Sequence, residues 1–504
     1  MPAPTTRSSS RALGSSTSSA MGPGRSRHSD VVELELGFID VVTGLGTDDR
    51  LHAGAQRTDG PDHEERVDPG VGEHLGLDQH DADDGDHHRR HRDHQADRPP
   101  PVEHVALLST GSGSHGVHLP RRRSVNHLDP RVAGPAVAHQ HGAVDVRQIG
   151  VEEELFLVDP ASRRLVAASD RAADPDSPGE VEQELFLQQV EIQTGPHRDL
   201  AALDADLRAA RQQAALAADA TGTRLAATAA PVMSDAGGET TPKQRYDTMT
   251  TRFGQVGRTA LVCGMHVHVD VRDDDEAVAV VDGLRPWLPL VLALSANSPF
   301  NLGADTGYAS WRAQVWDAWP SAGPVEPFGS PDAYRRAVEA LIASGAALDE
   351  GMIYLDARLA RRFPTVEVRV ADVCTDREDA VVVAAVVRAL VDLCARQRGG
   401  EPDAEPWRVE LLRAARWRAS RDGLAGSLID PVSRRTVAAA EAIGTLLDAI
   451  EPALEANGDT AVVRDGVARL LRQGDGAQRQ RAAAGADTDL SAVVDDVVRR
   501  TRPS

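Results

Sequence analysis

The segment GVEEELFLV, residues 150–158, has the pattern that decides the fold. Its apolar residues and the turn signal Asp-Pro that follows them predict a β-strand. Because side chains alternate between the two faces of a strand, Glu152 and Glu154 point the same way and Glu153 points the other way. Two like charges on one face of a core strand are costly unless a cation lies between them, and carboxylate oxygens suit a hard cation such as Mg²⁺.

Three later segments repeat this alternation. CGMHVHVDV, residues 263–271, places His266 and His268 on one face, and TVEVRV, residues 365–370, does the same for Glu367 and Arg369. The segment around Glu191 is a weaker copy. Any one of them is explained by a half-exposed strand whose polar residues face water. Four in one chain favour an antiparallel sheet with one polar, metal-binding face.

The pattern of apolar residues predicts three further elements. A strand is expected over residues 351–358, and a helix over residues 275–295 that Pro286 must kink or restart. Another helix is expected over residues 432–456, in the polar helical region after residue 400.

Composition restricts the classes of function. The chain has 504 residues and a formal net charge of −22, which argues against nucleic acid or an anionic membrane as the main partner. Its three cysteines, Cys263, Cys374 and Cys394, provide no disulfide framework, so a reducing compartment is expected. No apolar run is long enough to span a membrane, and the N-terminus lacks the core of a secretory signal. We therefore expect a cytoplasmic protein.

Residues 1–143 differ in composition from the rest of the chain. The segment 81–101 consists almost entirely of Asp, His, Arg, Gln and Pro. Such a sequence cannot bury enough apolar surface to offset its conformational entropy, which predicts a disordered extension rich in His, Asp and Arg. A metal-sequestering tail is the functional alternative. A start codon assigned too early is another, with Val144 as a sensible true start.

A turn-rich segment followed by a tryptophan-rich one lies at residues 298–320, with the sequence SPFNLGADTGYASWRAQVWDAWP. The first part predicts a loop beside the polar face of the sheet. The three tryptophans of the second part predict either a packed aromatic cluster or an anchor for a substrate loop. Asp305, Tyr308 and Arg312 are therefore candidates for binding substrate or nucleotide, together with His268.

Several motifs in a common order resemble the glutamate–cysteine ligase type 2 family, the bacterial carboxylate-amine ligases. They are GVEEELFLVDP, VEIQTGPHRDL, RYDTMTTRFG, CGMHVHVDV, SPFNLGADTGYASWRAQVWDAWP and IYLDARLARRFPTVEVRVAD. The resemblance covers about residues 148–400 and, more weakly, the helical end of the chain.

The resemblance implies an α+β fold with a curved, mainly antiparallel sheet like that of glutamine synthetase. One face of the sheet would be polar and catalytic, and helices would pack on the other. Residues 144–400 would form the catalytic ligase domain, and residues 401–504 a helical C-terminal region packed on it.

The implied reaction is the ATP-dependent joining of the glutamate γ-carboxylate to an amine, with cysteine as the first candidate. ATP would be a substrate and Mg²⁺ the cofactor, with Mn²⁺ as a substitute. Phosphorylation of the carboxylate would give an acyl phosphate, which the amine can attack. The resemblance assigns metal binding to Glu152, Glu154, Glu191, His266 and Glu367. It assigns contact with the transferring phosphate to Arg369, with Arg358 as the second candidate.

Two other functions remain open from the sequence. One is a glutamine-synthetase-like ligase that uses a different amine. The other is a metal-binding protein that acts through the His-rich extension and uses the sheet only as a scaffold. The expected partners are small-molecule substrates, and a homodimer is left open.

Overall fold

The computed structural model describes residues 146–235, 237–398 and 406–502. The disorder expected over residues 1–143 and the domain boundary expected at residue 400 both lie outside these described residues.

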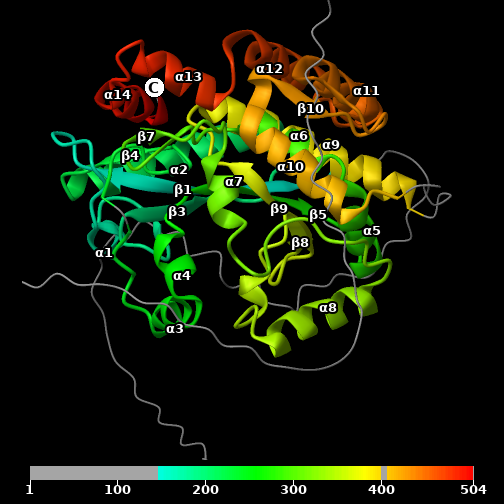
Figure 1. Cartoon of the computed structure of the whole chain (residues 1–504), viewed down its shortest axis with the longest axis horizontal. Coiled ribbons are helices and arrows are strands. Elements are labelled where there is room, and N and C mark those ends of the chain that lie inside the picture. The colour runs from blue at the N-terminus through cyan, green and yellow to red at the C-terminus, as the bar shows by residue number, and fades with distance from the viewer. Residues whose placement is uncertain (1–145, 236, 399–405, 503–504) are drawn as a thin grey trace, which may run out of the picture. The chain divides into compact units, whose positions relative to one another are not determined.

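An antiparallel sheet of seven strands is the centre of the described chain (Figure 1). The strands follow the order β2-β3-β1-β5-β9-β8, and β4 pairs with the far end of β1. The α+β architecture and the antiparallel sheet expected from the sequence are confirmed. The strands are β1 (Ile149–Val158), β2 (Glu182–Gln183), β3 (Gln189–Gln193), β4 (Arg224–Ala226), β5 (Gly264–Asp270), β8 (Ala357–Leu359) and β9 (Thr365–Asp372).

Apolar helices cover one face of the sheet (Figure 1). The Val- and Ala-rich helix α9 (Arg377–Gln397) is buried along most of its length and packs on β5, because the alternating valines of that strand point toward it. Helix α2 (Leu200–Ala220) begins at Asp199, whose side chain accepts a hydrogen bond from the amide of Ala202, and its apolar side packs on β3 and β4. Removing these side chains from water stabilises this layer.

A second group of elements lies on the opposite side of the sheet (Figure 1). It contains α3 (Gln244–Phe253), α4 (Gln255–Thr259) and α8 (Pro331–Ser344). The strand expected over residues 351–358 is replaced by the 3-10 helix η1 (Glu350–Met352) and the short strand β8. The reason is that Arg358 donates to the carbonyls of Gly351 and Ile353, which folds this segment back on itself.

The helix expected over residues 275–295 breaks at its proline, as predicted. Helix α5 (Asp274–Leu284) ends before Pro286, and α6 (Leu288–Ser295) begins after it. Within the described residues no single helix has the length and hydropathy to cross a membrane; α5 and α6 pass that test only as a pair bent by 69°. The remaining elements of this region are α1 (Ser169–Ala172), β6 (Phe300–Asn301), β7 (Ala304–Asp305) and α7 (Trp311–Trp316).

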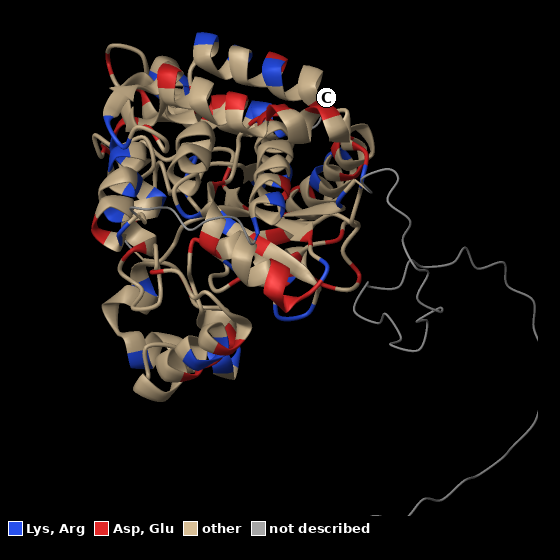
Figure 2. Cartoon of the chain, turned by 90° about the vertical axis from the view of Figure 1, so that its right-hand side faces the viewer, with Lys and Arg blue, Asp and Glu red and all other residues tan. Residues whose placement is uncertain are grey.

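The C-terminal region is mainly helical and carries acidic and basic residues intermingled along its helices (Figure 2). The helix expected over residues 432–456 starts later than predicted, because the Asp430 carboxylate accepts from the amides of Val432 and Ser433 and forms a turn between two short strands. The elements are α10 (Val409–Asp422), η2 (Gly423–Ala425), β10 (Ser427–Ile429), β11 (Thr436–Ala438), α11 (Ala439–Asn457), α12 (Thr460–Gln473), α13 (Gly476–Ala484) and α14 (Leu490–Thr501).

Candidate active site

Strand register brings the predicted ligands together on one face of the sheet. Glu152 of β1 lies opposite His266 of β5, and Glu154 of β1 lies opposite Glu191 of β3. Directly opposite residues in antiparallel strands have their Cβ atoms about 5 Å apart, so each pair shares one local site. On the next strand pair, His268 lies opposite Glu367. We call this the polar face.

Two groups of three donor residues result, and they share His266. The first is Glu152, His266 and Glu367, and the second is Glu154, Glu191 and His266. Within each group, the donor atoms all lie within 4.8 Å of one another. The five residues that the resemblance assigns to metal binding are therefore adjacent in space, although they come from four strands that are far apart in the sequence.

The two histidines of the polar face lie against the carboxylates of β1. His266 Nδ1 lies 3.1 Å from Glu152 Oε2, whereas its Nε2 is buried without a partner and lies 4.0 Å from Glu154 Oε1. His268 Nε2 is also buried, and it lies 3.3 Å from Glu152 Oε1. Burial and the nearby Arg369 guanidinium lower the pKa of His266, which keeps the imidazole neutral. A neutral imidazole with a free nitrogen is a metal ligand.

Two arginines flank the carboxylate of Glu367. Arg358 donates to both of its oxygens, at 2.7 and 3.0 Å, and Arg369 donates to Oε1 from the same strand face. The two guanidinium groups hold the pKa of Glu367 well below its usual range, although burial opposes them. The Nε of Arg369 is buried without a partner, and its guanidinium carbon lies 5.9 Å from the centre of the Tyr354 ring. Arg369 can therefore donate to a further anionic group.

Glu184 is a member of the site that the sequence pattern did not identify. Burial and the neighbouring Glu154 raise its pKa to about 7, and its carboxyl shares a hydrogen bond with Glu191. Burial and the charges of Glu184 and Glu152 raise the pKa of Glu191 as well. Glu184 lies outside the strands, so no alternation marks it. The only signal is its place in an acidic stretch just before β3.

The charge balance of the polar face favours a bound cation. Five carboxylates meet here, from Glu152, Glu154, Glu184, Glu191 and Glu367, against the two guanidinium groups of Arg358 and Arg369. Carboxylates this close cannot all be ionised without compensating positive charge. The unpartnered Nε2 of His266 and the excess of oxygen donors fit a divalent ion that prefers oxygen ligands, such as Mg²⁺ or Mn²⁺.

Glu153 points to the opposite face, as the alternation predicts. It is fully buried, and its two oxygens accept from Nε and Nη2 of Arg211 at 2.8 and 2.7 Å. Arg211 comes from α2 and also donates to the carbonyls of Cys374 and Thr375. This ion pair ties β1 to the residues that follow β9, directly behind the polar face.

The loop candidates have other surroundings. Asp305 accepts from Arg481 of α13 at 2.6 and 2.8 Å and is exposed. Tyr308 lies under the guanidinium of Arg421 and beside Trp417, both in α10. These two contacts join the loop to the C-terminal helices. Arg312 is only 1% exposed and donates to backbone carbonyls of β9. Trp316 and Trp319 form a packed group with Tyr354, in which the rings meet edge-on or tilted, whereas Trp311 meets the ring of Tyr308 edge-on.

Comparison with known proteins gives one consistent family. The family model described as "Glutamate-cysteine ligase family 2 (GCS2)" matches residues 148–496. A relative from Paenarthrobacter aurescens (strain TC1), named after glutamate–cysteine ligase 2-1, is 45% identical over 371 residues, which are 71% of this chain and 96% of the relative. A relative from Streptomyces coelicolor, named after glutamate–cysteine ligase 2, is 47% identical over 366 residues, or 71% of this chain and 99% of the relative.

A solved structure has a similar fold. It is glutamate–cysteine ligase from Francisella tularensis in complex with AMP, with a TM-score of 0.53 and 14% sequence identity, over 72% of this chain and 90% of that one. At this identity the likeness concerns the fold.

Proposed function

Because this chain belongs to glutamate–cysteine ligase family 2 and is an ATP-dependent carboxylate-amine ligase, we propose that it joins the γ-carboxylate of glutamate to the amine of cysteine. The intermediate in this proposal is γ-glutamyl phosphate, and the nucleotide product is ADP. The observation that carries the proposal is the polar face itself, where two donor groups share His266 and two arginines lie beside them.

The chemistry explains why such a face is needed. A carboxylate is a poor acyl donor, because it is negatively charged and has no leaving group that departs easily. Transfer of a phosphoryl group from ATP supplies the leaving group, but it brings several negative charges together. Bound divalent cations bridge phosphate oxygens and neutralise charge during such a transfer.

The two donor groups divide the proposed metal binding. Glu152 and Glu367 would hold one cation and Glu154 and Glu191 a second, and His266, whose neutral ring has one lone-pair nitrogen, would be a ligand of one of the two. The amide of Gly264 donates to Glu154 Oε2 at 2.6 Å, which fixes the direction of that carboxylate. Glu184 lies against the second group and would either add a ligand or keep a proton there, since its pKa is about 7.

The arginines act on the phosphoryl group in this proposal. Arg369 has a planar guanidinium with an unpartnered Nε, so it can bind phosphate oxygens beside the cations. Arg358 is held in a fork-to-fork contact with Glu367, which leaves it fewer free donors. We therefore assign the transferring phosphoryl group to Arg369 and the orientation of Glu367 to Arg358. Preorganised charges of this kind lower the barrier without reorganising during the reaction.

The test is ADP release by the purified full-length chain with MgATP, glutamate and a panel of amines, with mass spectrometry of the product. We expect ADP release that requires glutamate and is fastest with cysteine. Glutamate-dependent turnover with ammonia or another amine instead would support a glutamine-synthetase-like ligase. ATP turnover that does not depend on glutamate, or no turnover with any amine, would refute the proposal. Glu153→Gln is the matched control for substitutions of Glu152 and Glu154, since the Glu153 carboxylate lies on the opposite face of the sheet.

A further inference from the structure

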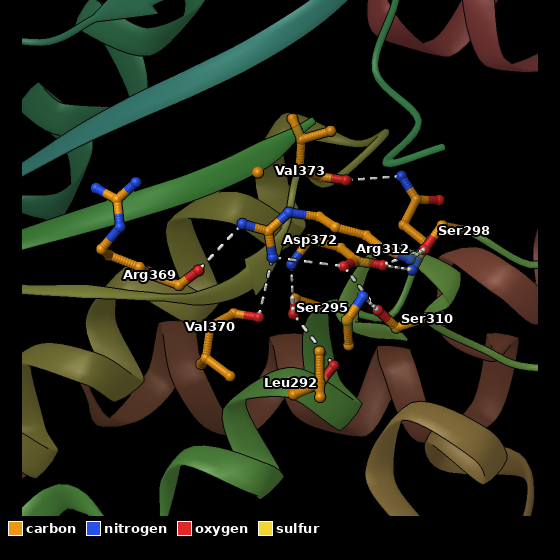
Figure 3. Close-up of polar contacts among 12 residues, drawn as sticks. Leu292, Ser295, Ser298, Ser310, Arg312, Arg369, Val370, Asp372 and Val373 are labelled. Atoms are coloured by element: carbon orange, nitrogen blue, oxygen red, sulfur yellow. Dashed lines mark hydrogen bonds and ion pairs between the residues drawn. The ribbon is translucent and has the colours of Figure 1, made fainter. Parts of the chain in front are cut away.

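Arg312 is a buried side chain that lies against the backbone of Arg369 and Val370 (Figure 3). It comes from α7, and its guanidinium donates to the carbonyl of Arg369 at 3.2 Å and to the carbonyl of Val370 at 3.3 Å. Its side chain is 1% exposed. A buried cation that donates to two successive backbone carbonyls fixes the course of the backbone at that point.

The two carbonyls mark an irregularity in β9. Met265 of β5 pairs with Ala371 of β9, but Val267 pairs with Val368, so Arg369 and Val370 together lie opposite the single residue His266. This is a β-bulge, which interrupts the ladder, bends the strand and changes the direction of its side chains. The side chain redirected here is that of Arg369, beside the donor groups.

The anchor of Arg312 is a buried carboxylate at the end of β9. Nη1 of Arg312 lies 3.9 Å from Asp372 Oδ1, and Asp372 accepts from Ser310 Oγ and Ser298 Oγ at 2.8 Å each and from the amide of Asn297 at 2.9 Å (Figure 3). Ser310 is also the N-cap of α7. The carboxylate thus joins the start of α7 to β9 and sets the position from which Arg312 extends.

A glycine in β5 makes room for the guanidinium. A Cβ atom at Gly264 would lie 2.3 Å from Nη2 of Arg312, closer than any real contact. Gly264 is also the residue whose amide donates to Glu154. Arg312 therefore lies beside β5 and β9, next to the residue whose amide holds Glu154 of β1 and next to the bulge that carries Arg369.

From these contacts we infer that Arg312 is a positioning residue for Arg369. By holding the carbonyls of residues 369 and 370, it maintains the bulge that directs the Arg369 guanidinium toward Glu367 and the phosphoryl position. The inference rests on the proposed function for the role of Arg369, but the contacts themselves do not depend on which amine is used. This role differs from the direct substrate binding that the sequence suggested for Arg312.

The experiment compares two ligands in the full chain. MgATP measures the ground state, and MgADP with aluminium fluoride mimics the phosphoryl group in transfer. We expect Arg369→Lys and Arg312→Lys each to weaken the aluminium fluoride complex at least about tenfold more than MgATP, since lysine keeps the charge but loses the fork. If Arg312 acts through Arg369, the double variant binds the analogue no more weakly than Arg369→Lys alone.

Arg388→Lys is the control for burial alone. Arg388 lies in α9, away from the bulge in β9, and is 0% exposed. It donates to the carbonyls of Arg147 and Arg198 and pairs with Asp459. It should lower the melting temperature without a selective loss of analogue binding. If Arg312→Lys does not fold, Gly264→Ala displaces the same guanidinium and should give the same selective loss.

The inference is overturned if Arg312→Lys behaves like Arg388→Lys, or if the losses multiply in the double variant. It is also overturned if the wild type does not bind the analogue, or if Arg369→Lys binds it normally. Failure of the proposed function has a different signature. In that case the wild type releases no ADP with glutamate and cysteine, while the coupling between Arg312 and Arg369 persists.

Discussion

Replacing the three glutamates of β1 one at a time should separate catalysis from stability. Glu152→Gln and Glu154→Gln alter the polar face, whereas Glu153→Gln alters the buried pair with Arg211. The three changes are chemically identical and fall on successive residues of one strand. We expect the two outer variants to lose turnover and the central variant to lose stability.

The size of each effect follows from the surroundings. The side chains of Glu153 and Arg211 are 0% and 1% exposed, and removing one charge of a buried pair costs about 3–5 kcal/mol. Because Gln keeps one hydrogen bond to Arg211, we expect a loss near the lower end of this range, about 3 kcal/mol. For a chain of this size, that loss corresponds to a fall in melting temperature of about 6 °C. Removing a carboxylate from either donor group should lower kcat by about 10²-fold or more, because cation binding and charge neutralisation are both weakened.

The assay pairs ADP release with thermal unfolding of the same preparations. Activity is compared at a temperature well below the unfolding transition of the weakest variant, so that loss of folded protein does not contribute. Equal loss of turnover in all three variants would show that the two faces of β1 do not have separate roles in catalysis and stability. An unchanged melting temperature in Glu153→Gln would show that the buried pair does not hold β1.

Four further outcomes are expected. Arg369→Lys should fold normally and bind MgATP within about threefold of the wild type, but its kcat should fall about 10²-fold; normal ADP release would leave Arg358 as the better candidate. Glu191→Gln in EDTA should melt a few degrees higher than the wild type at pH 8, because ionising a carboxyl whose pKa is raised by burial and like charges costs folded-state stability, and added Mn²⁺ should then stabilise it less than the wild type. Ion pairs with Arg147 and Arg272 lower the pKa of Glu276 from 4.5 to about 2, so the contribution of this carboxylate to folding stability is present above pH 4.5 and lost as the pH falls toward 2. Between pH 5 and pH 3, the melting temperature of the wild type should therefore fall more steeply than that of Glu276→Gln. A truncation that begins at Val144 should keep its activity and melting temperature because it retains Arg147, which donates to Glu276 and Asp392, whereas lost ADP release would revive a role for the His-rich extension.

The sequence by itself determined the strands and their faces. Period-two alternation is a local property of an extended chain, so GVEEELFLV was enough to place Glu152 and Glu154 opposite to Glu153. The same reasoning identified the strands of His266 and Glu367, and the proline predicted the break between α5 and α6. Element boundaries that depend on distant contacts were less accurate, as at residues 351–358, where Arg358 folds the segment back.

Only the tertiary structure decided which faces meet and what lies behind them. Strand order and register bring Glu154 beside Glu191 and Glu152 beside His266, and no local pattern encodes a pairing between distant segments. Glu184 joins the site from outside a strand, so alternation could not find it.

Arg312 shows the same limit most clearly. Its place in a motif near the site suggested substrate contact, and that stays a prediction, but only the structure shows that its guanidinium lies against the bulge in β9 and in the space at Gly264. A side chain's role depends on which surfaces surround it after packing. The alternation of a strand is set by its own backbone geometry, whereas the surroundings of a buried arginine are set by every element that closes over it.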